Sequence, residues 1–223
     1  FFTDPYDLTV LRPEDIIFTN TLSPFTNLSY YKTFDSRNGE ERFKSYFAIN
    51  ANKRFGVGFY IDYLYGRGLY ASQSTAFFNG GLFASYRGDK YNMHFIFNND
   101  NLKMAENGGI ADDRYITNPL DMAEGKKEYK SYDIPTNLNK VWNHNTSYHV
   151  FMTQRYNLGF HKEKTDSVTK DSVRIIQEFV PVTSFIHTLQ VDLNGRKYIS
   201  YDDEQNQKYF EHNYLGNDSI DKT

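Results

Sequence analysis

The sequence has no cysteine among its 223 residues, and this absence removes several kinds of chemistry. Disulfide bonds, thiolate nucleophiles and cysteine-based metal sites are all excluded. The net charge is small as well: a formal value of −3 gives no electrostatic reason to expect a nucleic-acid partner or an anionic membrane surface. No apolar run approaches the roughly 20 residues that a transmembrane helix needs. We therefore expect neither a thiol enzyme, nor a nucleic-acid-binding protein, nor a helical membrane protein.

Aromatic residues, in contrast, are abundant. The chain has 19 Phe and 19 Tyr, and 17% of its residues are aromatic. Its mean hydropathy is nevertheless low, at −0.69. A chain that is polar on average but rich in Tyr and Phe is typical of alternating β-strands. It is also typical of a transmembrane β-barrel, because the polar lumen and loops dilute the apolar surface.

Alternation is clearest in FGVGFYIDYLYGRG, residues 55–68. The odd positions from Phe55 to Tyr65 are all apolar or aromatic, whereas the even positions are mostly small or polar and include Asp62. Because a strand points successive side chains to opposite faces, this stretch predicts one apolar face and one polar face. The same alternation recurs in four further stretches: 41–51, 74–87, 91–100 and 146–160. It weakens in 179–193, where Pro181 would interrupt a central ladder.

Turn lengths predict the register, because partners across an antiparallel pair share a face. In the first of these hairpins, a three-residue turn pairs Phe47 with Phe59. In the next, a four-residue turn, 87–90, pairs Leu82 with Phe95. Both registers keep apolar residues opposite apolar residues, so the sequence predicts an antiparallel meander.

Connections of two lengths alternate along the chain. The turns near 52–54 and 88–89 are tight, whereas 66–73 and 104–145 are long, which is the layout of an outer-membrane barrel with short periplasmic turns and long extracellular loops. The segment 161–177 is long where a short turn is expected, so we predict a projecting hairpin or loop there, with its tip near 165–171. Residues 1–223 are expected to be a single domain of about eight strands and a portion of a larger, longer-chain barrel.

A soluble β-sandwich or a lipocalin-like barrel also uses alternating meander strands. Two features favour the membrane. The face opposite the aromatics is made of Gly, Asn, Tyr and Ser with scattered charges, rather than the Lys and Glu of a solvated face. Several strands also run well beyond the roughly 5–6 residues usual in soluble proteins and suit a tilted crossing of about 9–11.

Three stretches carry a family resemblance: FTNTLSPFTNLSYY (18–31), the strand-turn-strand block 43–97, and IPTNLNKVWNHNTSYHVFMTQRYNLGF (134–160). Together with 179–192 and 201–219 they resemble the Bacteroidota putative porin family. The resemblance implies a β-barrel pore in the bacterial outer membrane, with outer-membrane lipid as its surroundings. It carries over no catalytic residue and identifies no solute.

The alternation of odd and even positions divides the strand residues into two candidate sets, one for each face of the sheet. Six residues are predicted to line a pore: Lys44, Tyr60, Asp62, Asn79, His94 and Arg155. Seven are predicted to face lipid: Phe47, Ile49, Val57, Phe59, Ile61, Leu82 and Phe95. Charged wall residues would tune ion preference, and their mixed signs predict weak selectivity. Alternatively, they pair with one another or merely solvate a polar lumen.

No motif indicates catalysis or a cofactor. The glycines of 56–58 lack the Gly-Lys-Ser/Thr of a phosphate loop, and the six histidines show no metal-ligand spacing. Residues 98–101 and 111–114 offer oxygen atoms but lack the pattern of a calcium loop, so we interpret both as solvated turns. The sequence thus predicts no enzyme, no cofactor and no metal site.

Three functions remain open at this point. The first is a porin-like barrel that lets small hydrophilic solutes diffuse passively. The second is a plugged barrel that acts as a subunit of a larger assembly with other outer-membrane proteins, indicated by the long loops and the projecting 161–177 segment. The third is a soluble β-sandwich binding module.

Overall fold

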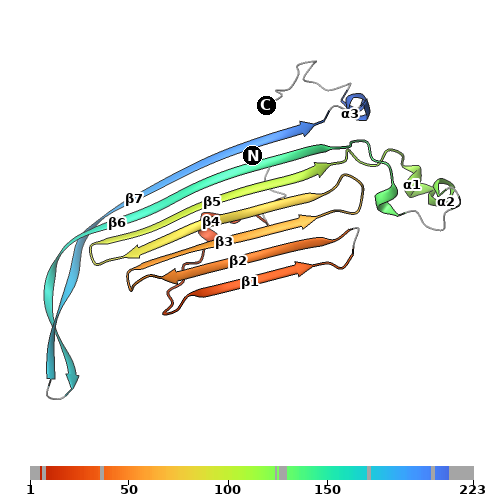
Figure 1. Ribbon diagram of the computed structural model, residues 1–223. Helices are drawn as coiled ribbons and strands as arrows, with labels where there is room; N and C mark the ends of the chain where they lie inside the picture. The colour runs from red at the N-terminus through yellow and green to blue at the C-terminus, as the bar shows by residue number, and fades with distance from the viewer. Residues whose placement is uncertain are drawn as a thin grey trace.

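Seven antiparallel strands form one sheet whose spatial order is the chain order, β1 to β7 (Figure 1). The computed structural model describes residues 6, 9–35, 38–123, 125, 130–169, 172–201 and 204–210. The strands are β1 (Phe25–Lys32), β2 (Glu40–Asn50), β3 (Phe55–Gly66), β4 (Thr75–Arg87), β5 (Tyr91–Glu106), β6 (Val141–Thr169) and β7 (Ser172–Ser200). The sheet is open, so β1 and β7 are its edges. An all-β meander is therefore confirmed, and its described part has seven strands where the sequence predicted about eight.

The register of the first long hairpin agrees with the sequence prediction, and that of the second does not. Phe47 lies opposite Phe59, as predicted. Leu82 lies opposite Phe97 and not Phe95. The β4–β5 turn is closed by a hydrogen bond from the Gly88 amide to the carbonyl oxygen of residue 91, which places the turn one residue further along. The pairing moves by two residues, so each side chain stays on its predicted face.

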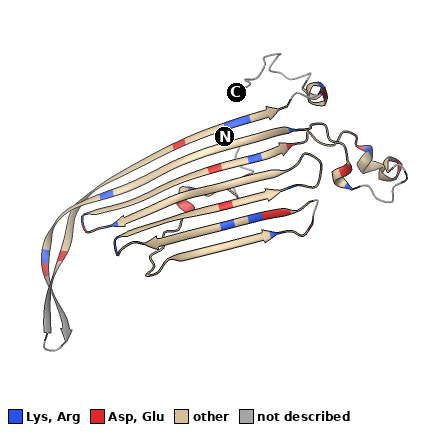
Figure 2. Cartoon of the chain, in the orientation of Figure 1, with Lys and Arg blue, Asp and Glu red and all other residues tan. Residues whose placement is uncertain are grey.

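One face of the sheet, which we call the Phe59 face, carries the odd-numbered side chains of β3. Leu82, Val57 and Phe59 remain 54%, 38% and 36% exposed there. Charged side chains are sparse along the strands compared with the ends of the sheet (Figure 2). The sheet thus exposes an extended apolar and aromatic surface, of the kind that marks contact with a membrane or a partner.

The opposite face, which we call the Tyr60 face, is partly covered by residues 9–21, the N-terminal segment (Figure 1). This segment includes the short helix η2 (Pro13–Asp15). Its apolar side chains pack against a buried group on four neighbouring strands: Ala48, Tyr60, Phe83 and Ile96. Tyr6 packs edge-on against Phe77, with ring centroids 5.5 Å apart. Two apolar clusters therefore lie between the N-terminal residues and the sheet, and other buried apolar residues, such as Leu138 and Val141, lie in and next to the 107–140 connection.

The hairpin of β6 and β7 projects far beyond the other strands at the end of the tight turns (Figure 1). Each of its strands has 29 residues. At about 3.3 Å per residue each spans roughly 95 Å. Beyond Tyr156, β6 no longer pairs with β5. The two-stranded part, 158–169 with 172–183, is called the arm below.

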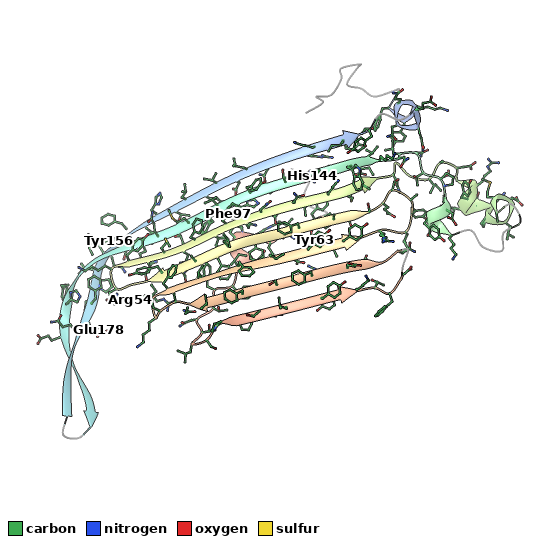
Figure 3. All side chains as sticks on the ribbon, viewed as in Figure 1. Arg54, Tyr63, Phe97, His144, Tyr156 and Glu178 are labelled. Atoms are coloured by element: carbon green, nitrogen blue, oxygen red, sulfur yellow. The ribbon has the colours of Figure 1, made fainter. Side chains whose placement is uncertain are left out.

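The arm covers the range 161–177, where the sequence predicted a projecting hairpin or loop. The last two residues of the predicted tip, 170 and 171, lie outside the described residues. Pro181 lies at a register shift between Leu158 and Gly159, so the ladder is irregular there but the strand continues. In Figure 3, Tyr156 marks where the arm leaves the sheet and Glu178 lies on the arm itself.

The long connection between β5 and β6 covers residues 107–140. It contains α1 (Arg114–Thr117), α2 (Pro119–Met122) and η3 (Ser131–Asp133), and a bridge joins Ile110 to Thr136. After β7, α3 (Glu204–Tyr209) returns to this connection, where the Asn206 side chain bonds both the amide and the carbonyl of Asn139. Across the described ranges, no helix is both long and apolar enough to cross a membrane.

Candidate functional site

The six side chains predicted to line a pore all belong to the Tyr60 face. The strand registers fix this, because Lys44 lies opposite Asp62 and Asp62 lies opposite Asn79. His94 lies opposite Thr153. Arg155 is two residues after Thr153 on β6, so its side chain is on the same face. Their environments differ, however, and pore lining itself stays a prediction.

Asp62 is the centre of a charged group near the loop end of the sheet. Arg42 donates two hydrogen bonds to its carboxylate, from Nε at 2.9 Å and from Nη2 at 2.7 Å. The Lys44 ammonium lies 3.4 Å from the same carboxylate. Lys44 and Asp62 are thus paired, and Arg42, which the sequence interpretation did not single out, is the closer partner. Its position on β2, two residues before Lys44, is the alternation that could have identified it.

Tyr60 and Asn79 lie beneath the N-terminal segment. Tyr60 is 5% exposed and belongs to the main apolar cluster. The Asn79 side-chain amide donates a hydrogen bond to the Thr9 carbonyl oxygen. These two side chains therefore contact the segment that crosses the wall rather than open space.

His94 and Arg155 lie toward the tight-turn end and are exposed. The ring of Phe18, on the N-terminal segment, meets the His94 imidazole edge-on with centroids 5.1 Å apart. The six predicted residues therefore do not form one compact site. They are distributed along the Tyr60 face, with a charged group at one end and an aromatic contact at the other.

A second polar group on the same face was not assigned a role from the sequence. Asn98 and Asp100 lie on β5, and His149 and Asp192 lie on β6 and β7. The His149 Nδ1 atom is 2.6 Å from Asp192, and its Nε2 atom is 3.6 Å from Asp100. The interpretation of 98–101 as a solvated turn is therefore wrong: these residues are inside β5, and the alternation of 91–97 simply continues through them.

A cavity of about 540 Å³ lies between the N-terminal segment and the last strands of the sheet. Arg12 and Glu14 line it from the segment, and His149, Asp192 and Arg196 line it from the sheet. Its volume is within the range of small-molecule pockets, about 300–1,000 Å³. The lining mixes both charges with amide side chains, which suits water and polar solutes.

The described residues contain no group of three or more His, Cys, Asp or Glu side chains arranged to hold a metal ion.

In the 107–140 connection, the other predicted turn, at 111–114, is a surface loop leading into α1. There the Arg114 guanidinium donates to Asp112 and holds the pKa of that carboxyl below its ordinary value. This pair is local to the loop and is not part of the wall.

The seven side chains predicted to face lipid all belong to the Phe59 face. The stacked rings of Phe47 and Phe59, with centroids 5.5 Å apart, lie on neighbouring strands of it. Tyr63 and Phe97, labelled in Figure 3, lie on β3 and β5 and extend the same face. Contact of this face with lipid stays a prediction.

A family model described as "Putative porin" matches residues 1–223. The chain belongs to this family. No curated protein and no solved structure shows a significant match. Membership indicates a porin-like role in general terms and the bacterial outer membrane, in agreement with the resemblance seen in the sequence. It names no solute, partner or mode of transport.

Proposed function

We propose that this chain contributes part of the wall of an outer-membrane pore through which small hydrophilic solutes diffuse passively. The observation that carries the proposal is one sheet with two chemically distinct faces. The Phe59 face exposes aliphatic and aromatic side chains, whereas the Tyr60 face carries amides and paired charges around an apolar cluster that the N-terminal segment covers. A barrel in a bilayer needs this division, because lipid surrounds it and water fills it.

Strand length supports the same conclusion. Strands β2 to β5 have 11, 12, 13 and 16 residues, each enough for the roughly 9–11 that a tilted strand needs to cross the hydrocarbon core. A β-sandwich would need a second sheet over the apolar face, and the described strands all belong to a single sheet.

The N-terminal segment makes the proposed pore narrower than the sheet alone would. It lies on the side assigned to the lumen and is held by sheet side chains, including the Tyr46 hydroxyl, which donates to the Ile17 carbonyl oxygen at 2.6 Å. The 540 Å³ cavity beside it remains open to polar solutes. We therefore expect a restricted pore rather than a wide one.

Planar-bilayer recording of the full-length protein tests the proposal. Discrete conductance steps are expected, and Lys44→Gln should shift the reversal potential toward cation preference because it removes one positive charge from the wall. Lys162→Gln on the arm is the matched control and should leave the reversal potential unchanged. An absence of conductance over a range of salt concentrations would count against a pore.

A spin label at position 59 tests the assignment of faces separately. Lipid-dissolved oxygen should relax the label efficiently, whereas a water-soluble relaxation agent should not. The reverse pattern would place the Phe59 face against water and remove the basis of the proposal.

A second function, a plugged barrel that serves as a subunit of a larger outer-membrane assembly, is favoured by two features. The N-terminal segment covers much of the Tyr60 face, and the arm projects where the other turns are tight. Purification from mild detergent distinguishes the two functions. A stoichiometric partner lost on deletion of 161–177 supports the assembly, and a free, conducting barrel contradicts it.

A further inference from the structure

Four polar side chains of the Tyr60 face occupy neighbouring positions on β3, β4 and β5, beneath the N-terminal segment. Three of them are almost completely buried: Asn98, Asp100 and Asn79 are 0%, 1% and 2% exposed. Their Oδ1 atoms, and the Tyr60 hydroxyl, make no hydrogen bond with any described residue. Buried polar atoms are normally satisfied, because leaving one unpaired costs about 1–3 kcal/mol.

The orientation of the two amides is set by the N-terminal segment. The Asn98 Nδ2 atom donates to the Leu11 carbonyl oxygen at 2.8 Å, and the Asn79 Nδ2 atom donates to the Thr9 carbonyl oxygen. A carbonyl can only accept, so turning either amide around would set oxygen against oxygen. Both Oδ1 atoms must therefore point away from the segment, toward their neighbours on the sheet.

Glycine at position 81 brings the Tyr60 hydroxyl to the same place. Tyr60 and Asn98 both lie opposite Gly81, from the strands on either side of it. A Cβ atom at Gly81 would lie 2.6 Å from Tyr60 Cε1, so the tyrosine ring occupies the space that a side chain would fill. The ring thus extends across β4 toward β5. Asn79, for its part, lies directly opposite Asp100.

The two oxygen atoms of Asp100 have different neighbours. Oδ2 is 3.4 Å from Asn98 Nδ2 and 3.6 Å from His149 Nε2, whereas Oδ1 has no hydrogen-bond donor among the described residues. Asp100 is 1% exposed, whereas Asp192, on the other side of His149, is exposed. One positive charge at Oδ1 would neutralise the buried Asp100 carboxylate, which a low-dielectric site strongly favours.

We propose that these oxygen atoms bind a single hard monovalent cation, with sodium as the ion that fits. The ligands are one carboxylate oxygen, two amide oxygens and one phenolic oxygen, all of the hard type that alkali and alkaline-earth ions prefer over softer metals. Charge decides for a monovalent ion, because Asp100 is the only carboxylate among the four ligands and a divalent ion would leave an excess positive charge in this buried site. The sequence predicted no metal site here because only one of the four ligands is a carboxylate, and no metal-ligand spacing marks amide and phenolic oxygens.

The bound ion would also hold the N-terminal segment in place. It fixes the Oδ1 atoms of Asn79 and Asn98, and so presents their Nδ2 atoms to the segment. Binding of the cation and docking of the segment are therefore coupled, and the coupling must be reciprocal. This inference does not depend on solute passage, so a barrel without conductance would leave it intact.

The test measures docking of the segment as a function of sodium concentration in the full-length protein. A nitroxide spin label is attached to the cysteine of Glu14→Cys, an exposed position on the segment. Its spectrum reports the docked and released populations of the segment, at a urea concentration where half of the molecules have released it. N-methylglucamine chloride replaces sodium chloride at constant ionic strength. Above the dissociation constant, each tenfold rise in sodium should raise the docking equilibrium constant about tenfold. Docking independent of sodium would overturn the proposal.

Two variants identify the site. Asp100→Asn should abolish the sodium dependence, whereas Asp89→Asn, which changes an exposed turn carboxylate, should preserve it. Sodium dependence that survives Asp100→Asn, or a wild-type protein that responds to calcium alone, would contradict the assignment.

Discussion

The coupling energy of the Arg42–Asp62 ion pair measures how far water is excluded from the Tyr60 face. The two side chains are 31% and 10% exposed and share two hydrogen bonds, at 2.9 and 2.7 Å. Arg54 and Asp89, in neighbouring turns, form a pair of nearly the same length, 2.9 Å, but are 54% and 59% exposed. Both are Arg–Asp pairs; the buried one has two hydrogen bonds and the exposed one has one. The exposed pair therefore serves as the reference for the buried pair.

The expected magnitudes follow from that difference. A hydrogen bond to a charged group contributes about 1.5–3 kcal/mol when it is shielded from water. Arg42 is still one-third exposed, and Lys44 can partly replace it at Asp62, so we expect a coupling energy of about 2 kcal/mol for the buried pair. The exposed pair should contribute less than about 1 kcal/mol, because water and salt screen it.

Double-mutant cycles provide the assay. Arg42→Met and Asp62→Asn are made singly and together, and Arg54→Met and Asp89→Asn likewise. Urea unfolding of the full-length protein in detergent micelles gives the free energy of unfolding for each variant. Equal coupling energies for the two pairs would refute the reasoning, because the wall would then be as wet as a surface turn.

Two further predictions concern single positions. Gly81→Ala should destabilise the protein by about 1–3 kcal/mol in the same unfolding assay, since the new methyl group would collide with the Tyr60 ring, and combining it with Tyr60→Ala should cost less than the sum of the two. Arg114→Gln should let the pKa of Asp112 rise toward its ordinary value, because the guanidinium that stabilises the ionised carboxyl is removed. Carboxyl-carbon NMR titration measures the change, and an unchanged pKa would show that another group sets it.

Much of the sheet could be predicted from alternation alone. Parity assigns Phe59 and Tyr60 to opposite faces, and a turn of known length then fixes the pairing of Phe47 with Phe59. Parity cannot detect a shift of two residues, since such a shift keeps every side chain on its face. This is why Leu82 was paired with Phe95 instead of Phe97, and only the geometry of the turn at Gly88 decides between them.

The position of the N-terminal segment could not be predicted. Leu11, Ile16 and Phe18 follow neither the period of a strand nor that of a helix, and their packing partners lie on distant strands. The segment is held largely through its backbone carbonyls, such as that of Leu11, and every residue has a carbonyl. Asparagines on the polar face of adjacent strands, here Asn79 and Asn98, are the sequence feature that could have indicated this contact. Their side-chain amides can donate hydrogen bonds to the backbone carbonyls of a segment that crosses the sheet.

The order of the strands has a consequence for the order of folding events. Since spatial order and chain order are the same, each strand pairs only with the strands before and after it in the sequence, and the sheet can grow one hairpin at a time. The N-terminal segment is the exception. The Leu11 carbonyl finds its donor at Asn98, 87 residues later in the chain. This segment precedes every strand of the sheet in the sequence, yet it must wait until the fifth strand is in place, and it is among the last of the described elements to reach its final position.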